Sequence, residues 1–177
     1  MSKEYTDIVY DTEFIERGPH HPIDLISLGM VRSDGKQYYA VSNAFDASRV
    51  KHHPWLSVNV WPHLPLNDQG VLDRKNPIIK SRQQIAFDVR EFVLELPNPR
   101  LWAAWSAYDH VVLCQLFGSM VDLPPGFPMH TKDIKSLSED LGDPPWPKQL
   151  SAEHHALTDA QYGKEVLDFL KTSPFIE

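Results

Sequence analysis

The chain has 177 residues, 42% of them hydrophobic and 23% charged, which are ordinary values for one globular domain with a sizeable core. The formal net charge of −7 excludes the basic surface of a passive, non-specific DNA binder, although it leaves room for an enzyme that acts on nucleic acid. A single cysteine rules out an intrachain disulfide, and the lack of a signal-peptide core or a run of ~20 apolar residues predicts a cytoplasmic protein without membrane contact.

Three strands are predicted in the first part of the chain. An apolar run indicates a strand over residues 5–14, and two further strands are expected over 23–32 and 37–43. The turn-forming residues 33–36 join the last two as a hairpin. Residues 44–79 are interrupted by prolines, so short helices and loops are expected there.

Helical and strand patterns alternate in the rest of the chain. Apolar residues recur at helical spacing from Ile85 to Leu96, which predicts a helix that begins after the N-cap Ser81 and stops at Pro97. The other expected elements are a strand at 101–106, a helix at about 108–118 that Gly118 ends, a short strand near Met129, and helices at about 132–141 and 158–171. No repeat or domain boundary interrupts this order, so residues 1–177 are expected to form one α/β domain with a mixed sheet.

Two carboxylates close the first predicted strand. Side chains alternate faces along a strand, so Asp11 and Glu13 point the same way, about 7 Å apart. Val9 shares their face, and the opposite face carries Ile8, Tyr10, Thr12 and Phe14. Two buried carboxylates repel each other, and a hard divalent cation is the simplest group that could hold them together. Two solvated acids in a loop are the alternative explanation.

Two more carboxylates head the apolar faces of predicted helices. Asp109 precedes Val112 and Leu113 on one helix, and Asp159 begins a similar stripe on the last helix. An unpaired buried carboxylate is costly, so its occurrence twice suggests a common ligand. Interaction with the helix dipole is the alternative for Asp109, and helix capping is the alternative for Asp159.

His154 lies five residues before Asp159, where its imidazole could take a proton from water near pH 7. The alternative is a surface histidine, since His154-His155 is one of several adjacent pairs in the chain. A zinc site is disfavoured because there is no His-Glu-x-x-His motif and no cysteine pair, whereas carboxylates favour magnesium or manganese. Cys114 falls on a predicted core helix without a motif that would make it a nucleophile.

In the order Asp11, Glu13, Asp109, His154 and Asp159, the sequence resembles the DEDDh (DnaQ-like, ribonuclease T-like) 3′-5′ exonucleases of the ribonuclease H-like superfamily. Nearly the whole chain is similar to the small actinobacterial enzymes of the polyadenylate-specific 3′-exoribonuclease AS group, most clearly at residues 10–16, 81–85, 107–110 and 155–160. One position departs from the wider pattern: many DEDDh enzymes carry an asparagine four residues before the third carboxylate, where this chain has Trp105.

The resemblance implies a ribonuclease H-like exonuclease fold, with a mixed five-stranded sheet of order 3-2-1-4-5, strand 2 antiparallel, flanked by helices. It implies a homodimer that removes nucleoside 5′-monophosphates from the 3′ end of single-stranded or 3′-overhang RNA, with adenylate-rich RNA among the candidate substrates. A DNA 3′-5′ exonuclease and a catalytically silent RNA-binding relative are the alternatives. A silent relative should lack at least one metal ligand, and none is missing here.

The resemblance also implies a role for each site residue. Two Mg²⁺ ions, for which Mn²⁺ could substitute, would act on the scissile phosphate. Asp11 would bridge both ions, Glu13 and Asp159 would bind the ion that activates water, and Asp109 would bind the other. His154 would be the general base. The expected substrate contacts are Phe14, Thr12 and Tyr108, with core packing as the alternative for Phe14. The sequence assigns no role to His20, His21, Arg82 or Gln83.

Overall fold

Six strands form one mixed sheet in the order β4-β3-β2-β1-β5-β6. The computed structural model describes residues 4–172, so the ends of the expected domain, 1–3 and 173–177, lie outside the described residues. The strands are β1 (Thr6–Ile15), β2 (Asp24–Arg32), β3 (Gln37–Ser42), β4 (Ile79–Lys80), β5 (Pro99–Ala103) and β6 (Thr131–Asp133). Strand β2 is antiparallel to both β1 and β3, whereas β5 is parallel to β1 and to β6.

The predicted strand order 3-2-1-4-5 is confirmed, with β5 and β6 as its fourth and fifth strands. The predicted number of five strands is wrong, because β4 adds a sixth strand in parallel at the outer edge of β3. Its two residues lie between Pro77 and the helix N-cap Ser81. A strand of two residues is too short to show an alternating pattern, so it could not be predicted from hydrophobic periodicity.

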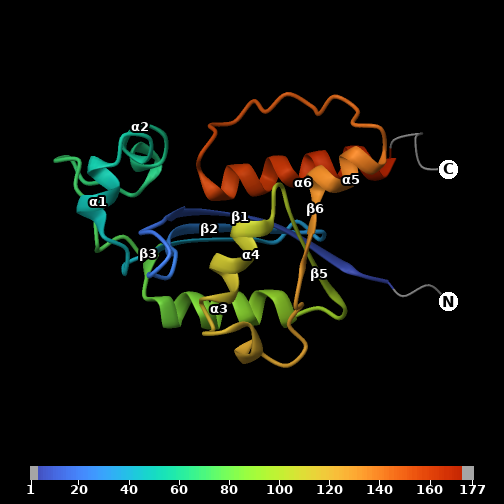
Figure 1. Ribbon diagram of the computed structural model, residues 1–177, viewed down its shortest axis with the longest axis horizontal. Coiled ribbons are helices and arrows are strands. Elements are labelled where there is room, and N and C mark those ends of the chain that lie inside the picture. The colour runs from blue at the N-terminus through green and yellow to red at the C-terminus, as the bar shows by residue number, and fades with distance from the viewer. Residues whose placement is uncertain (1–3, 173–177) are drawn as a thin grey trace.

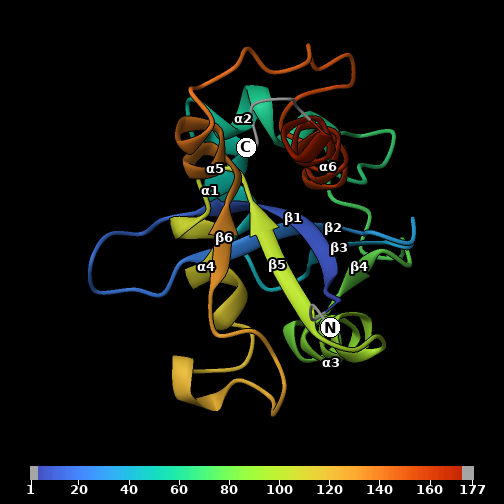
Figure 2. The same cartoon turned by 90° about the vertical axis from the view of Figure 1, so that its right-hand side faces the viewer.

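Helices cover both faces of the sheet (Figures 1 and 2). The helices are α1 (Ala47–His52), α2 (Leu56–Asn59), α3 (Arg82–Leu94), α4 (Ala107–Cys114), α5 (Ile134–Asp140) and α6 (Ala156–Thr172), with 3₁₀ turns η1 (Trp61–His63) and η2 (Met120–Asp122). Helices α3 and α4 lie on one face and α5 and α6 on the other, while α1 and α2 form a lobe beyond the end of the sheet (Figure 1). Among the described residues, no helix is long and apolar enough to span a bilayer.

Strand β1 contributes to the core on both of its faces. Ile8 and Tyr10 pack into the cluster that contains Ile85 of α3, whereas Val9 packs with Leu167 of α6 on the opposite face. The predicted alternation of side chains along this strand is therefore confirmed. Each of these buried apolar side chains stabilises the fold by about 1.5–3 kcal/mol relative to full exposure.

Several predicted boundaries shift because of local backbone geometry. The α3 helix ends at Leu94, so Leu96 lies outside its apolar stripe, and α4 ends at Cys114 rather than near Gly118. Strand β5 ends at Ala103, since Trp105 adopts a left-handed backbone with φ of 51°. The predicted helix at 132–141 begins only after Asp133, whose carboxylate caps α5.

The segment between α5 and α6, residues 141–155, has no regular structure and runs back over α6 (Figure 1). Trp146 Nε1 donates to Ser138 Oγ at 2.9 Å, and the Tyr162 hydroxyl donates to the Pro147 carbonyl oxygen at 2.8 Å. Gln149 Nε2 donates to Asp159 Oδ1 at 2.6 Å. These bonds hold the segment against both helices, next to the first turn of α6.

Candidate active site

Strand β1 extends past its parallel neighbour β5, and the third carboxylate occupies the space that this leaves. The pairing of β1 with β5 ends at Val9, so residues 10–15 have no strand partner on that side. Helix α4 begins there, and Asp109 in its first turn accepts hydrogen bonds from the Thr12 amide at 2.9 Å and the Thr12 hydroxyl at 2.5 Å. The Asp109 carboxylate is thus fixed to the edge of β1, and the residue is only 7% exposed.

The first turn of α6 lies directly on the sheet because β2 carries a glycine opposite Asp11. Gly29 pairs with Asp11 across the ladder. A Cβ atom at Gly29 would lie 2.3 Å from the Ala156 carbonyl oxygen, which no side chain could tolerate. This close approach brings Asp159, also in the first turn, over β1.

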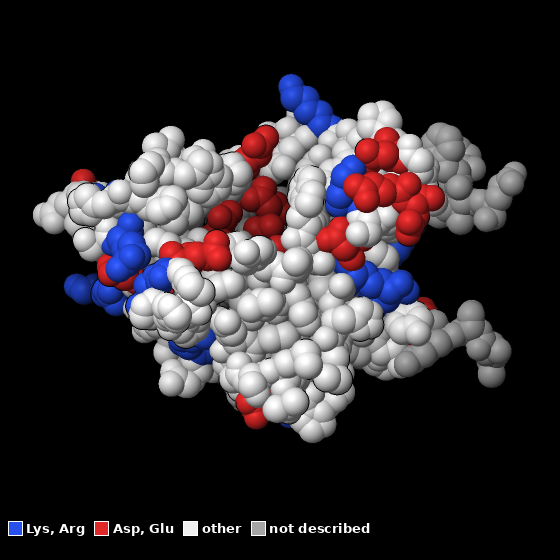
Figure 3. Space-filling model, viewed as in Figure 1, with Lys and Arg blue, Asp and Glu red and all other residues white. Residues whose placement is uncertain are grey.

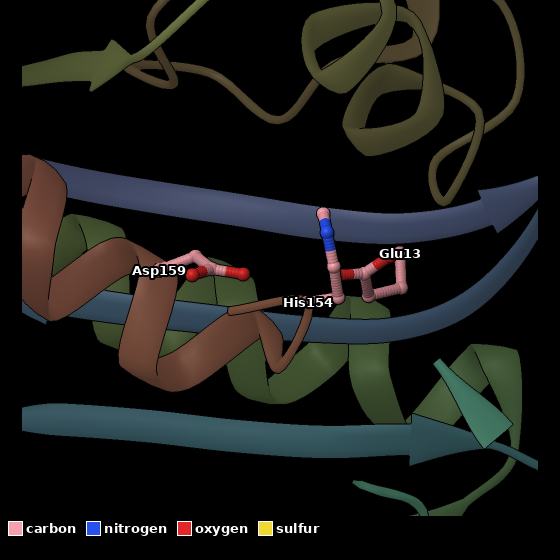
Figure 4. A group of neighbouring side chains, drawn as sticks. All are labelled: Glu13, His154 and Asp159. Atoms are coloured by element: carbon pink, nitrogen blue, oxygen red, sulfur yellow. The ribbon is translucent and has the colours of Figure 1, made fainter. Parts of the chain in front are cut away.

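Three of the predicted residues meet in a tight group. One ligand atom each from Glu13, His154 and Asp159 lies within 4.8 Å of the others. Figure 4 shows that Glu13 comes from β1, Asp159 from α6, and His154 from the loop just before that helix. His154 holds a left-handed backbone with φ of 64°, which turns the chain into the helix.

The two adjacent histidines have different surroundings. His155 stacks on Tyr39 with ring centroids 4.5 Å apart, and its Nδ1 accepts the Thr158 amide at 3.4 Å. His154 instead meets Trp55 edge-on at 4.7 Å. Because His155 caps the helix, α6 begins at Ala156, earlier than the predicted 158, and Asp159 is not its N-cap.

The carboxylates interact strongly enough to change their acidity. Burial, followed by the charges of Asp109, Glu13 and Asp159, raises the pKa of Asp11 well above its usual value. Burial and the charge of Asp159 raise the pKa of Glu13 to about 8. Burial also raises the pKa of Asp109 to about 6, although the hydrogen bonds from Thr12 oppose the shift. The pKa of Asp159 is raised by burial against the hydrogen bond from Gln149.

Figure 3 shows acidic side chains at the bottom of a hollow on this face of the molecule. Among residues 4–172, no lysine or arginine forms an ion pair with any of the four carboxylates. A set of carboxylate oxygens is the donor type that Mg²⁺ and Mn²⁺ prefer. The residues present therefore fit a hard divalent cation.

Two cavities flank the carboxylates. One, of about 300 Å³, is lined by Glu13 and Phe14 together with Trp55 from the α1–α2 lobe. The other, of about 210 Å³, is lined by Asp11, Asp159 and several aromatic side chains. Phe14 stacks nearly parallel on Tyr108 with ring centroids 5.8 Å apart, and Tyr108 is 53% exposed.

Other residues named from the sequence lie outside this group. His20 and His21 are exposed in the loop after β1, and Gln83 is exposed on α3. Arg82 donates to the Gln115 carbonyl oxygen at 2.8 Å, which fixes α3 to the end of α4. Gln149 contacts the site but was not predicted, because it lies in an irregular segment without a recognisable pattern.

The sheet order, the helices on both faces and the carboxylates at the end of β1 define a ribonuclease H-like fold of the exonuclease type. The chain belongs to the 3′-5′ exoribonuclease Rv2179c-like domain family, whose sequence profile matches residues 6–170.

Two relatives carry the same activity in their names. The 3′-5′ exoribonucleases MT2234.1 and Rv2179c, from the CDC 1551 / Oshkosh and ATCC 25618 / H37Rv strains of Mycobacterium tuberculosis, are each 44% identical over 154 residues. The alignment covers 86% of this chain and 85% of each relative. The Mg²⁺- and Mn²⁺-bound structure of S. pombe Pop2p shares the fold, with a TM-score of 0.57 at 13% identity over 95% of this chain and 84% of Pop2p.

Proposed function

We propose that the chain, as one domain over residues 1–177, is a metal-dependent 3′-5′ exoribonuclease of the DEDDh type. The observation that carries this proposal is the convergence of four carboxylates from β1, α4 and α6, none of which forms an ion pair with a lysine or arginine of residues 4–172. The exoribonuclease family supports the reaction, and the metals in the Pop2p structure support the choice of cation.

We infer that two Mg²⁺ or Mn²⁺ ions would be held by Asp11, Glu13, Asp109 and Asp159. When bound, these ions would stabilise charge on the phosphate and lower the pKa of the attacking water. The charges of all three other carboxylates raise the pKa of Asp11, so a cation held by this group would also relieve the repulsion on Asp11. Thr12 fixes the orientation of Asp109 through two hydrogen bonds.

The protein itself supplies a general base. His154 lies beside Glu13 and Asp159, where its imidazole can accept a proton as water attacks the last phosphorus of the RNA. The bond from phosphorus to the 3′ oxygen of the preceding nucleotide then breaks. The products are a nucleoside 5′-monophosphate and an RNA shortened by one residue with a free 3′-hydroxyl.

The cavity between Phe14 and Trp55 is the proposed position of the 3′-terminal nucleotide. Aromatic rings on its walls can stack on any base, so this contact would be tolerant of sequence. Tyr108 stacks on Phe14 and is sufficiently exposed to contact RNA itself. Thr12 is buried and donates to Asp109, so we propose that it positions a ligand and does not touch RNA directly.

Matched RNA and DNA oligonucleotides test the proposal directly. We expect single-stranded RNA to be shortened from its 3′ end in Mg²⁺ or Mn²⁺, and to remain intact in EDTA. A blocked 3′ terminus should protect the RNA, and 3′-overhang duplexes should be trimmed to their base-paired part. Faster cleavage of DNA would favour the proofreading alternative, and cutting of circular RNA would contradict an exonuclease.

Two further measurements test the finer predictions. The rates of cleavage of oligo(A) and oligo(U) measure any adenylate preference, and sedimentation measures whether the protein forms the predicted homodimer.

A further inference from the structure

The two cavities beside the carboxylates lie at opposite ends of the acidic row. Glu13, near the end of β1, lines the cavity that contains Phe14. Asp11, two residues earlier, lines the other cavity together with Gly163, which is one turn further along α6 than Asp159. A phosphate held at the carboxylates would therefore have a separate cavity on each side of it.

The wall of the second cavity is built from three aromatic side chains. Trp105 and Trp146 have ring centroids 5.4 Å apart, and Trp146 lies 6.4 Å from Tyr162. Trp146 is anchored through its indole N–H to Ser138, and Tyr162 is anchored through its hydroxyl to Pro147. Two of the three aromatic side chains in the wall are therefore anchored by hydrogen bonds.

Trp105 is the least expected member of this wall. It has a left-handed backbone with φ of 51°, which is costly for a bulky side chain, and 66% of its surface is exposed. Burial in the core therefore does not explain why a tryptophan stands here. A further cavity of about 220 Å³ also borders Trp105 and Trp146, which leaves space on more than one side of the Trp105 ring.

The lining of the second cavity indicates the chemistry of its occupant. None of the described residues that line it is a lysine or an arginine. Three of them are acidic: Asp11, Glu153 and Asp159. A phosphate would be repelled there, but a neutral, planar ring could stack on the indole. At about 210 Å³ the cavity is smaller than sites for drug-sized ligands, and suits a single ring system.

We propose that this cavity binds the base of the second nucleotide from the 3′ end, stacked on Trp105. The inference rests on the proposed exoribonuclease function. The scissile phosphate joins the terminal and second nucleotides, so with the phosphate at the carboxylates and the terminal base beside Phe14, the second base falls on the side of Trp105. Stacking without specific hydrogen bonds would accept any base.

Binding of uridine 5′-monophosphate and of the dinucleotide uridylyl-(3′→5′)-uridine, which has no 5′-phosphate, separates the two cavities. We would measure both by calorimetry in Ca²⁺, after checking by chromatography that the dinucleotide stays intact. Loss of one stacked base should weaken dinucleotide binding by Trp105→Ala about 5- to 150-fold, while mononucleotide binding stays within about twofold of wild type. Trp105→Phe should retain most of the dinucleotide affinity. Phe14→Ala should weaken the binding of both ligands.

Trp105→Asn is the control for folding. Asparagine tolerates a left-handed backbone, so this variant should melt no lower than wild type yet lose the same dinucleotide affinity as Trp105→Ala. If wild type cleaves RNA but both variants bind the dinucleotide normally, the second cavity is not a base site, although the proposed function stands. Equal losses for mononucleotide and dinucleotide would also overturn the inference. If wild-type protein neither binds nor cleaves RNA, the proposed function itself fails.

Discussion

Strand β1 carries buried carboxylates at both of its ends, and their surroundings are opposite. Asp7, near the start of the strand, is 8% exposed and accepts hydrogen bonds from Arg100 at 2.5 Å, from Trp102 at 2.8 Å, and from Lys171. These partners outweigh the effect of burial and lower the pKa of Asp7 to about 2. Glu13, at the other end of the strand, is 7% exposed, and its pKa is raised to about 8.

We propose that the difference reflects two different roles for these carboxylates. Asp7 is neutralised by the protein's own cations and therefore links β1, β5 and α6 as part of the fold. Asp11 and Glu13 lie beside other acids, which is unfavourable for an isolated protein and favourable for one that binds a divalent cation. Perturbed acidity in a hollow, without an internal ion pair, is typical of a functional site.

Replacing one carboxylate at each end of β1 by asparagine should produce the largest effects on activity and stability. Asp11→Asn should reduce cleavage of 3′-labelled RNA below detection while the protein stays folded, because the proposed ions would lose a carboxylate ligand. Asp7→Asn should leave cleavage by the folded protein unchanged but lower the free energy of unfolding by about 1–3 kcal/mol, since partly exposed cations lose their partner. Full nuclease activity in Asp11→Asn would contradict the assignment of Asp11 to the active site. An Asp7→Asn variant that is stable but inactive would contradict the purely structural role of Asp7.

The adjacent histidines offer a second comparison. His154→Ala should lower single-turnover cleavage by about 10²–10⁴-fold, as is typical for a lost general base, and leave RNA and metal binding nearly unchanged. His155→Ala should lose helix-capping stability of about 0.5–2 kcal/mol, with only a mild effect on turnover. Rates measured from pH 6 to 9 test both variants. If His155→Ala is the variant with the large loss of turnover, the general base is His155 and not His154. If both variants keep full activity, the metal alone activates the attacking water.

Gln149 offers a third and smaller test of how the site is supported. Its amide orients the Asp159 carboxylate from the segment that crosses α6, so Gln149→Ala should weaken Mn²⁺ binding by about 10–100-fold. Gln161, which donates to Gln37 on the exposed side of the same helix, is the matched control. Calorimetric titration with Mn²⁺ measures both variants. Equal affinity in Gln149→Ala and Gln161→Ala would show that the Gln149 contact has no positioning role.

Local patterns were sufficient to predict the main strands, the long helices and the strand alternation that places Asp11 and Glu13 together. They also placed Asp109 and Asp159 at the starts of helices, because apolar stripes at helical spacing begin there. The resemblance to a known family supplied the strand order, and the structure agrees with that order. These features depend on neighbours close in the sequence or on a family-wide arrangement.

Features that depend on contacts between distant segments were not predictable in the same way. Gly29 is required only because the α6 backbone lies against it, a contact across more than a hundred residues. The helix start at Ala156 follows from the cap made by His155, and the early end of β5 follows from the turn at Trp105. The aromatic cavity joins a turn, an irregular segment and a helix, so no periodic pattern marks it.

The central claim is that the acids at the end of β1 bind a divalent cation, and the pH dependence of unfolding tests it most directly. A folded-state pKa of about 8 for Glu13, above its ordinary 4.5, means that this group favours folding below pH 4.5 and loses that contribution as pH rises through 8. The contribution of Asp7 to stability has the opposite pH dependence. It is fully present above pH 3.8 and is lost as pH falls through about 2.

The measurement is thermal unfolding between pH 5 and pH 8.5, in EDTA and in excess Mn²⁺. In EDTA we predict that the melting temperature falls as pH rises, because the free energy of unfolding decreases by on the order of a few kcal/mol. Mn²⁺ should restore the melting temperature at the alkaline end of the range. In Glu13→Gln the fall in EDTA should be smaller and the gain from Mn²⁺ should be reduced. A melting temperature that Mn²⁺ leaves unchanged at pH 8 in the wild-type protein would contradict the account.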